Sequence, residues 1–71
     1  MAMKNLYNGK GEFIGSTNDL GNVITCYGSK GEYLGYYDKN TKQTLKASGG
    51  IIQQNGIEGL GYLIYSNYKN S

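Results

Sequence analysis

Two nine-residue units of this chain are near-copies of each other: residues 7–15 (YNGKGEFIG) and residues 27–35 (YGSKGEYLG). Five of the nine positions are identical, and the Phe/Tyr and Ile/Leu exchanges are conservative. A third, degenerate copy stands 18 residues after the second, at residues 45–53 (LKASGGIIQ). Self-similarity at a short spacing indicates that one small structural unit is used three times.

Each unit has the composition of a β-hairpin. Its short polar stretch ends in Gly11 in the first copy and in Gly31 in the second, where a glycine supplies the positive φ that closes a type I turn with a bulge. Residues 23–27 (VITCY) are β-branched and aromatic and predict a strand, with residues 32–37 as its return partner. The predicted fold class is therefore all-β, a small antiparallel sheet of three repeated β-hairpins.

The boundaries follow from this repeat. Residues 5–65 are predicted to form one hairpin-repeat domain, in which the polar segments 18–22 and 38–43 link the units. Residues 1–4 are interpreted as a disordered start or a cloning scar, and residues 1–3 also resemble a second start site. Residues 66–71 are interpreted as a flexible tail.

The segment before that tail is ambiguous. The apolar residues of this segment recur at the spacing of one helix face: Ile57, Leu60, Leu63 and Ile64. Against a helix, Gly59 and Gly61 each cost about 1 kcal/mol relative to alanine in a helix interior. A closing strand or an irregular cap over residues 60–65 is the preferred interpretation.

The size of the chain predicts self-association. A chain of 71 residues buries only about 60% of the surface that its unfolded form exposes. No proline blocks a sheet edge, and exposed edges invite pairing with another chain. The apolar residues exceed what one face of so small a monomer can cover, so the sheet is expected to be completed by homo-oligomerisation.

The residue inventory excludes several kinds of active site. Histidine, arginine, tryptophan and proline are absent, and Cys26 is the only cysteine. An intramolecular disulfide, a structural zinc site and a Ser-His-Asp or Cys-His catalytic set are therefore impossible within one chain. Cys26 is expected to be buried, and Glu12 and Glu32 occupy equivalent repeat positions expected to face solvent. The chain is predicted not to be an enzyme and to need no metal or cofactor.

Charge argues against two classes of partner. The net charge is only +2, and the seven lysines are dispersed along the chain, whereas nucleic-acid binders usually carry a basic stripe. No apolar run approaches the roughly 20 residues that a membrane crossing needs. Neither nucleic acid nor membrane is an expected partner, and a cytoplasmic location is the simpler interpretation of one free thiol.

Eight tyrosines form the one set of side chains that suggests a binding surface. Tyr36 and Tyr37 are adjacent, so a strand would place one ring on each side of the sheet. One interpretation is that these rings fill the core and the subunit interfaces. The other is a ligand or partner surface built from Tyr33, Tyr36 and Tyr37, with Lys30 and turn amides assisting.

The chain resembles short phage and bacterial proteins that repeat a Tyr-x-x-x-Gly-x-aromatic-aliphatic-Gly hairpin, similar to β-flower domains. The residues that carry the resemblance lie in the two clear units and in a Leu-rich tail from 54 to 64, and together span roughly residues 5 to 65. The resemblance implies a small all-β protein of phages or mobile elements. It transfers no catalytic residue.

The expected function is binding rather than chemistry. In the leading hypothesis a phage or mobile-element accessory protein, in the host cytoplasm, binds a host factor or sequesters a small nucleotide-like ligand and so blocks a host process such as defence. Two alternatives stay open. One is a structural or assembly component of a virion, and the other is a weak nucleic-acid binder that stacks bases on tyrosine and contacts phosphates with lysine.

Overall fold

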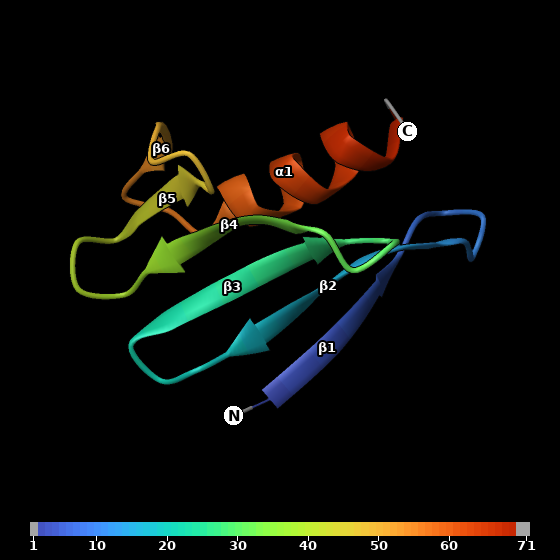
Figure 1. The fold of residues 1–71 in the computed structure, drawn as a ribbon, viewed down its shortest axis with the longest axis horizontal. Helices are drawn as coiled ribbons and strands as arrows, with labels where there is room; N and C mark the ends of the chain where they lie inside the picture. The colour runs from blue at the N-terminus through green and yellow to red at the C-terminus, as the bar shows by residue number, and fades with distance from the viewer. Residues whose placement is uncertain (1, 70–71) are drawn as a thin grey trace.

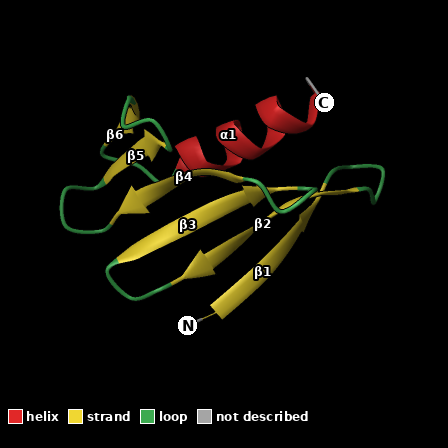
Figure 2. Ribbon diagram, in the orientation of Figure 1, coloured by secondary structure: helices red, strands yellow, loops and turns green. Residues whose placement is uncertain are grey.

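Six strands and one helix make up the computed structural model, which describes residues 2–69. In chain order they are β1 (Ala2–Tyr7), β2 (Phe13–Asp19), β3 (Val23–Gly28), β4 (Tyr33–Asp38), β5 (Gln43–Lys46), β6 (Ile51–Gln54) and α1 (Glu58–Lys69). Each strand pairs antiparallel with the next, and α1 lies across one side of the sheet (Figures 1 and 2). The predicted antiparallel sheet of hairpins is confirmed, although the helix makes the fold mostly β rather than all-β.

The three hairpins β1–β2, β3–β4 and β5–β6 close with the same turn. Its last residue is a glycine with φ between 80° and 100°, a conformation that side chains rarely tolerate. The equivalent hydrogen bonds run from Gly11 N–H to Asn8 O (3.0 Å), from Gly31 N–H to Gly28 O (3.0 Å) and from Gly49 N–H to Lys46 O (2.8 Å). The turn chemistry expected for the first two copies is therefore confirmed, and the third copy closes in the same way.

A β-bulge follows each turn and resets the alternation of side chains. Ile14 has no partner, because Leu6 pairs with Gly15 and Tyr7 pairs with Phe13. The corresponding bulge residues of the other hairpins are Leu34 and Ile52. Since the bulge stands at the same place in every hairpin, the degenerate third unit is a structural repeat of the first two.

Two glycines of the repeat let α1 lie close to the sheet. A Cβ atom built on Gly15 would lie 2.7 Å from Ile64 Cγ2, and one built on Gly35 would lie 2.8 Å from Leu63 Cδ1. Carbon atoms do not approach so closely, so the helix occupies the space that side chains would fill. The buried apolar side chains of the described residues gather at this contact: Ile14, Cys26, Leu60 and Ile64.

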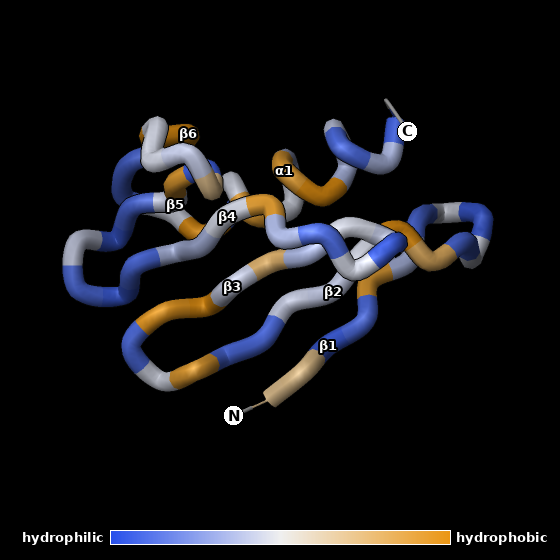
Figure 3. The backbone as a smooth tube through the Cα atoms, viewed as in Figure 1, coloured by the Kyte–Doolittle hydropathy of each residue, from blue (hydrophilic) through white to orange (hydrophobic). Residues whose placement is uncertain are grey.

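Residues 60–65 are helical, so the prediction of a closing strand or an irregular cap is wrong. The apolar stripe of α1 packs on the sheet at helical spacing, through Leu60, Leu63 and Ile64. Gly59 lies against Thr44, and Gly61 faces open space. Hydrophobic residues mark the middle of α1 in Figure 3. Tertiary packing of this stripe outweighs the intrinsic cost of the two glycines.

The ends of the domain differ from the predicted boundaries. Residues 2–4 do not form a disordered start but pair with β2, from Ala2 opposite Asp19 to Lys4 opposite Thr17. Residues 66–69 do not form a flexible tail but continue α1. Residue 1 and residues 70–71 lie outside the described part of the chain. The predicted range 5–65 is therefore too short for the folded unit.

Candidate functional site

The two sides of the sheet differ in what covers them. Directly opposed residues of antiparallel strands point to the same side of a sheet, and neighbours along a strand point to opposite sides. Cys26 and Gly35 are opposed, and Gly35 lies directly beneath α1. Thr25 and Tyr36, one position away on the same strands, therefore point to the side that α1 leaves uncovered.

We call this uncovered side the aromatic face. Its large side chains come from all six strands: Met3, Tyr7, Phe13, Tyr27, Tyr33, Tyr36, Leu45 and Ile51. Among the most exposed of them, Tyr7 is 58%, Ile51 is 51% and Tyr33 is 45% exposed. Exposed apolar side chains gathered from every strand on one side of a sheet are a feature of interaction sites rather than of ordinary monomer surfaces.

Equivalent positions of the hairpins supply the pairs that build this face. The rings of Tyr7 and Phe13 meet edge to face, with centroids 5.9 Å apart and planes at 61°. Tyr27 and Tyr33 repeat the arrangement at 5.9 Å and 53°. The third hairpin carries an aliphatic pair instead, Leu45 and Ile51. Cross-strand pairs of this kind hold their side chains in place, so the face is pre-organised for contact.

Uncharged polar side chains stand between the apolar ones on the aromatic face: Asn5, Ser16, Asn18, Thr25, Gln43 and Gln54. Thr25 finds its partners within the sheet. The Thr25 hydroxyl lies 3.1 Å from the Tyr27 hydroxyl and donates to the backbone oxygen of Asn18 at 3.3 Å. Asn18 Oδ1, by contrast, is buried and accepts no hydrogen bond from the described residues. A buried polar atom of this kind normally has a hydrogen-bond partner.

Charge is nearly absent from the aromatic face. The strands after β1 contain three charged residues, Asp19, Asp38 and Lys46. Asp19 and Lys46 share the helix side with Gly35 through the register, as does Lys4 on β1. Asp38 points to the aromatic side, but it stands at the end of β4, and its carboxylate accepts the Asn40 N–H at 2.9 Å. The face therefore offers apolar contact without charge complementarity to a phosphate.

The structure brings together some of the residues predicted for the binding surface and separates others. Tyr33 and Tyr36 lie on the aromatic face. Tyr37 points to the opposite side, where it packs half-buried against the core. Lys30 lies in the second turn, where its backbone N–H donates to Glu32 Oε1 at 2.9 Å. Sequence reasoning missed Tyr7 and Phe13, although their correspondence to Tyr27 and Tyr33 in the repeat was available as a signal.

The Glu12 and Glu32 carboxylates accept hydrogen bonds from the end of α1. Tyr68 donates its hydroxyl to Glu12 Oε1 at 2.9 Å, and Asn67 donates its amide to Glu32 Oε2 at 3.0 Å. The expectation that both carboxylates face solvent is wrong for Glu32, which is half-buried. Hydrogen bonds from Asn8 and then from Tyr68 lower the pKa of Glu12. The Asn67 amide, followed by backbone N–H groups, lowers the pKa of Glu32.

These two carboxylates predict a loss of stability in acid. Because their pKa values are lower in the folded chain than the ordinary 4.5, their contribution is full above that value and is lost as pH falls through the folded pKa values. We expect the urea midpoint of the chain to fall between pH 6 and pH 3, and to fall less in the double variant Glu12→Gln, Glu32→Gln. The pKa of Asp19 is lowered by its hydrogen bond to Lys39, so this carboxylate should account for the pH dependence of the urea midpoint that remains in the double variant. An equal slope in both proteins would contradict this role.

Cys26 is fully buried beneath α1, as expected from its strand. Burial raises the pKa of its thiol to about 11, so the sulfur stays protonated and unreactive near neutral pH. Within residues 2–69 no group of three or more His, Cys, Asp or Glu side chains is placed to hold a metal ion. Cys26 therefore belongs to the core.

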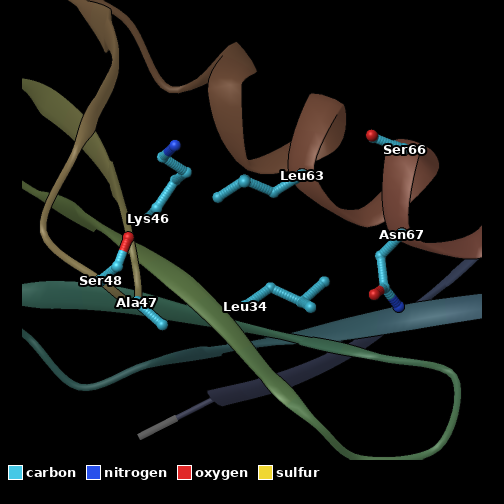
Figure 4. A pocket seen from close by; sticks show the side chains of 7 residues that line it. All are labelled: Leu34, Lys46, Ala47, Ser48, Leu63, Ser66 and Asn67. Carbon is cyan, nitrogen blue, oxygen red and sulfur yellow. The ribbon is translucent and has the colours of Figure 1, made fainter.

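A shallow groove of about 460 Å³ separates α1 from the turn of the third hairpin (Figure 4). Leu34 and Leu63 form its apolar part, and the Lys46 side chain extends toward the helix beside them. Asn67 also lines this groove, but its amide is already bonded to Glu32. The groove offers a small apolar surface with one exposed ammonium group.

Known proteins give no indication of the function of this chain. No family model, curated protein or solved structure matches it significantly. No helix in the described residues has the length and apolar character needed to cross a membrane.

Proposed function

We propose that this chain is a non-enzymatic binding protein that works as a homodimer, in which the aromatic faces of two copies pack against each other. The observation that carries the proposal is the exposed, almost uncharged aromatic surface on the side of the sheet opposite α1. Sheets packed face to face form cores about 10 Å thick in which the side chains of the two inner faces interdigitate. The paired rings of the first two hairpins supply such side chains.

The area and the charge of the aromatic face fit a second copy. Its five most exposed side chains alone offer roughly 500 Å², against the roughly 800 Å² per partner of a standard interface, and the half-buried tyrosines add to this area. A face that carries almost no charge also brings two copies together with little repulsion, although each carries a net charge of +2.

The same features support binding rather than catalysis. Four of the five acidic side chains are already engaged. The Glu12, Glu32 and Asp38 carboxylates accept hydrogen bonds within turns or from α1, and Asp19 forms an ion pair with Lys39 at 2.9 Å. A nucleotide or nucleic acid needs cations beside the rings on which its bases stack, and the strands place none on the aromatic face. The hypothesis of a phage accessory protein that blocks a host process rests on the sequence resemblance.

Sedimentation equilibrium tests the homodimer. We expect a particle of twice the 7.8 kDa chain mass, with a dissociation constant insensitive to salt, because no charged pairs cross the interface. The double variant Tyr33→Ser, Tyr36→Ser should weaken association about a hundredfold, since each substitution removes aromatic contacts from both copies.

A matched variant on α1 controls for a general effect of losing tyrosine. Tyr62 and Tyr65 are 61% and 55% exposed, and both stand on α1, across the sheet from Tyr33 and Tyr36. Tyr62→Ser with Tyr65→Ser should leave the dimer intact. A wild-type monomer at about 100 µM, or equal dissociation of the two double variants while both stay folded by circular dichroism, would contradict the proposed homodimer.

A further inference from the structure

β1 leaves one side of its backbone without a strand partner. It stands at one end of the strand order, and its six residues contain no proline. The other edge strand, β6, has four residues, and α1 packs against it. By contrast α1 packs against β2 through β6 and does not reach β1 (Figure 1). A long, uncovered edge with free N–H and C=O groups is a template for another extended chain.

A groove of about 400 Å³ lies beside this edge, between β1 and the start of α1. It is on the helix side of the sheet and therefore opposite the aromatic face. The residues that make its lining mostly apolar are Ala2, Leu6, Ile24, Ile57 and Leu60. Ile57 is 46% exposed there, because no element of residues 2–69 covers it. We call this depression the β1 groove.

Lys4 gives the β1 groove a charge. It is exposed, and it points to the groove side from the middle of β1, between Ala2 and Leu6. The single ion pair among residues 2–69 joins Lys39 to Asp19, which also lines the groove. The Asp19 carboxylate is thus already neutralised by Lys39, whereas the Lys4 ammonium has no acidic partner within the described chain.

We propose that β1 and the β1 groove bind an extended segment of a partner protein, which adds a seventh strand to the sheet. Backbone hydrogen bonds to the edge supply affinity, and side chains at alternate positions supply specificity. Residues of the added strand that lie beside Ala2, Lys4 and Leu6 all face the groove, because side chains alternate with period two. The complementary sequence is apolar-x-acidic-x-apolar, with its carboxylate against the Lys4 ammonium.

This site goes beyond the homodimer and does not depend on it. The dimer uses the opposite side of the sheet, so it would leave both β1 grooves open and make the particle bivalent. The Tyr33→Ser, Tyr36→Ser variant carries an unaltered β1 and therefore allows the peptide site to be tested in the monomer.

The experiment titrates that variant with a fluorescein-labelled, end-capped peptide, TVTETVT, and follows fluorescence anisotropy and ¹H–¹⁵N spectra. We expect saturable binding with shifted amide signals along residues 2–7. Lys4→Glu should weaken binding of this peptide about tenfold and strengthen binding of the matched peptide TVTKTVT, which restores the opposite charge. The reversed peptide preference of Lys4→Glu would show recognition at this position, because damage to the fold would weaken binding of both peptides.

A second probe tests the backbone component without altering the protein. N-methylation of alternate peptide amides removes the donors that face β1 and should abolish binding, whereas methylation of the intervening amides should preserve it. The absence of saturable binding up to about 1 mM, signal changes outside residues 2–7 and the groove, or equal loss from both methylation patterns would each overturn the proposal.

Discussion

Replacement of Ile64 by alanine is expected to lower the free energy of unfolding by about 2–5 kcal/mol. Ile64 is completely buried in α1 and lies over Gly15 of β2, so it joins the helix to the centre of the sheet. At about 0.05–0.15 kcal/mol per residue, a domain of 71 residues has a total stability on the order of 4–10 kcal/mol. The loss of this one side chain should therefore leave a substantial unfolded population at room temperature.

Urea unfolding followed by far-ultraviolet circular dichroism measures this loss. Tyr62→Ala is the matched control, because Tyr62 stands two residues away on the same helix but is mainly exposed, and its truncation should change stability by less than about 0.5 kcal/mol. Both proteins must be compared at one concentration, since dimerisation would add to the apparent stability. Equal, small losses in the two variants would mean that α1 does not dock on the sheet in solution.

The hairpins were predictable because their signals are local. The glycine that ends each turn needs a positive φ, and this requirement acts within four residues of chain. The same local chemistry identified the third unit, although Leu45 replaces the tyrosine of the first two copies. The turn type and the strand pairing within each hairpin followed from these positions.

The helix was not predictable in the same way. The low helix propensity of Gly59 and Gly61 argued against a helix. Gly59 is nevertheless required there, because the Thr44 side chain, fifteen positions earlier in the chain, leaves no room for a Cβ atom. The stripe of Leu60, Leu63 and Ile64 becomes decisive only when a sheet is available to bury it. A non-local contact therefore overrode a local preference.

The candidate site was predictable in part for the same reason. Alternation placed Tyr36 and Tyr37 on opposite sides of the sheet, but nothing local specified which side α1 would cover. Because the helix covers the side of Tyr37, Tyr36 is left on the aromatic face with Tyr33. Contacts such as Tyr68 to Glu12, which join residues 56 positions apart, carry no signal in a single sequence.

Gly35→Ala is expected to destabilise the chain by about 1–3 kcal/mol. The added methyl group would meet the backbone oxygen of Leu45 on β5 and the Cδ1 atom of Leu63 on α1. Leu63 can rotate, but the Leu45 carbonyl is held in the sheet, so the methyl group forces β4 and β5 apart or lifts α1. The same change at a glycine with free space has the opposite sign.

Gly61→Ala supplies that comparison. No heavy atom lies within 4 Å of the Cβ position at Gly61, which is helical and exposed, so alanine should stabilise the chain by about 0.5–1 kcal/mol through its higher helix propensity. The two variants make the same chemical change, and thermal unfolding should move their midpoints in opposite directions. If Gly35→Ala were as stable as the parent chain, α1 would not lie against β4 at this position, and the assignment of the uncovered side as the aromatic face would lose its basis.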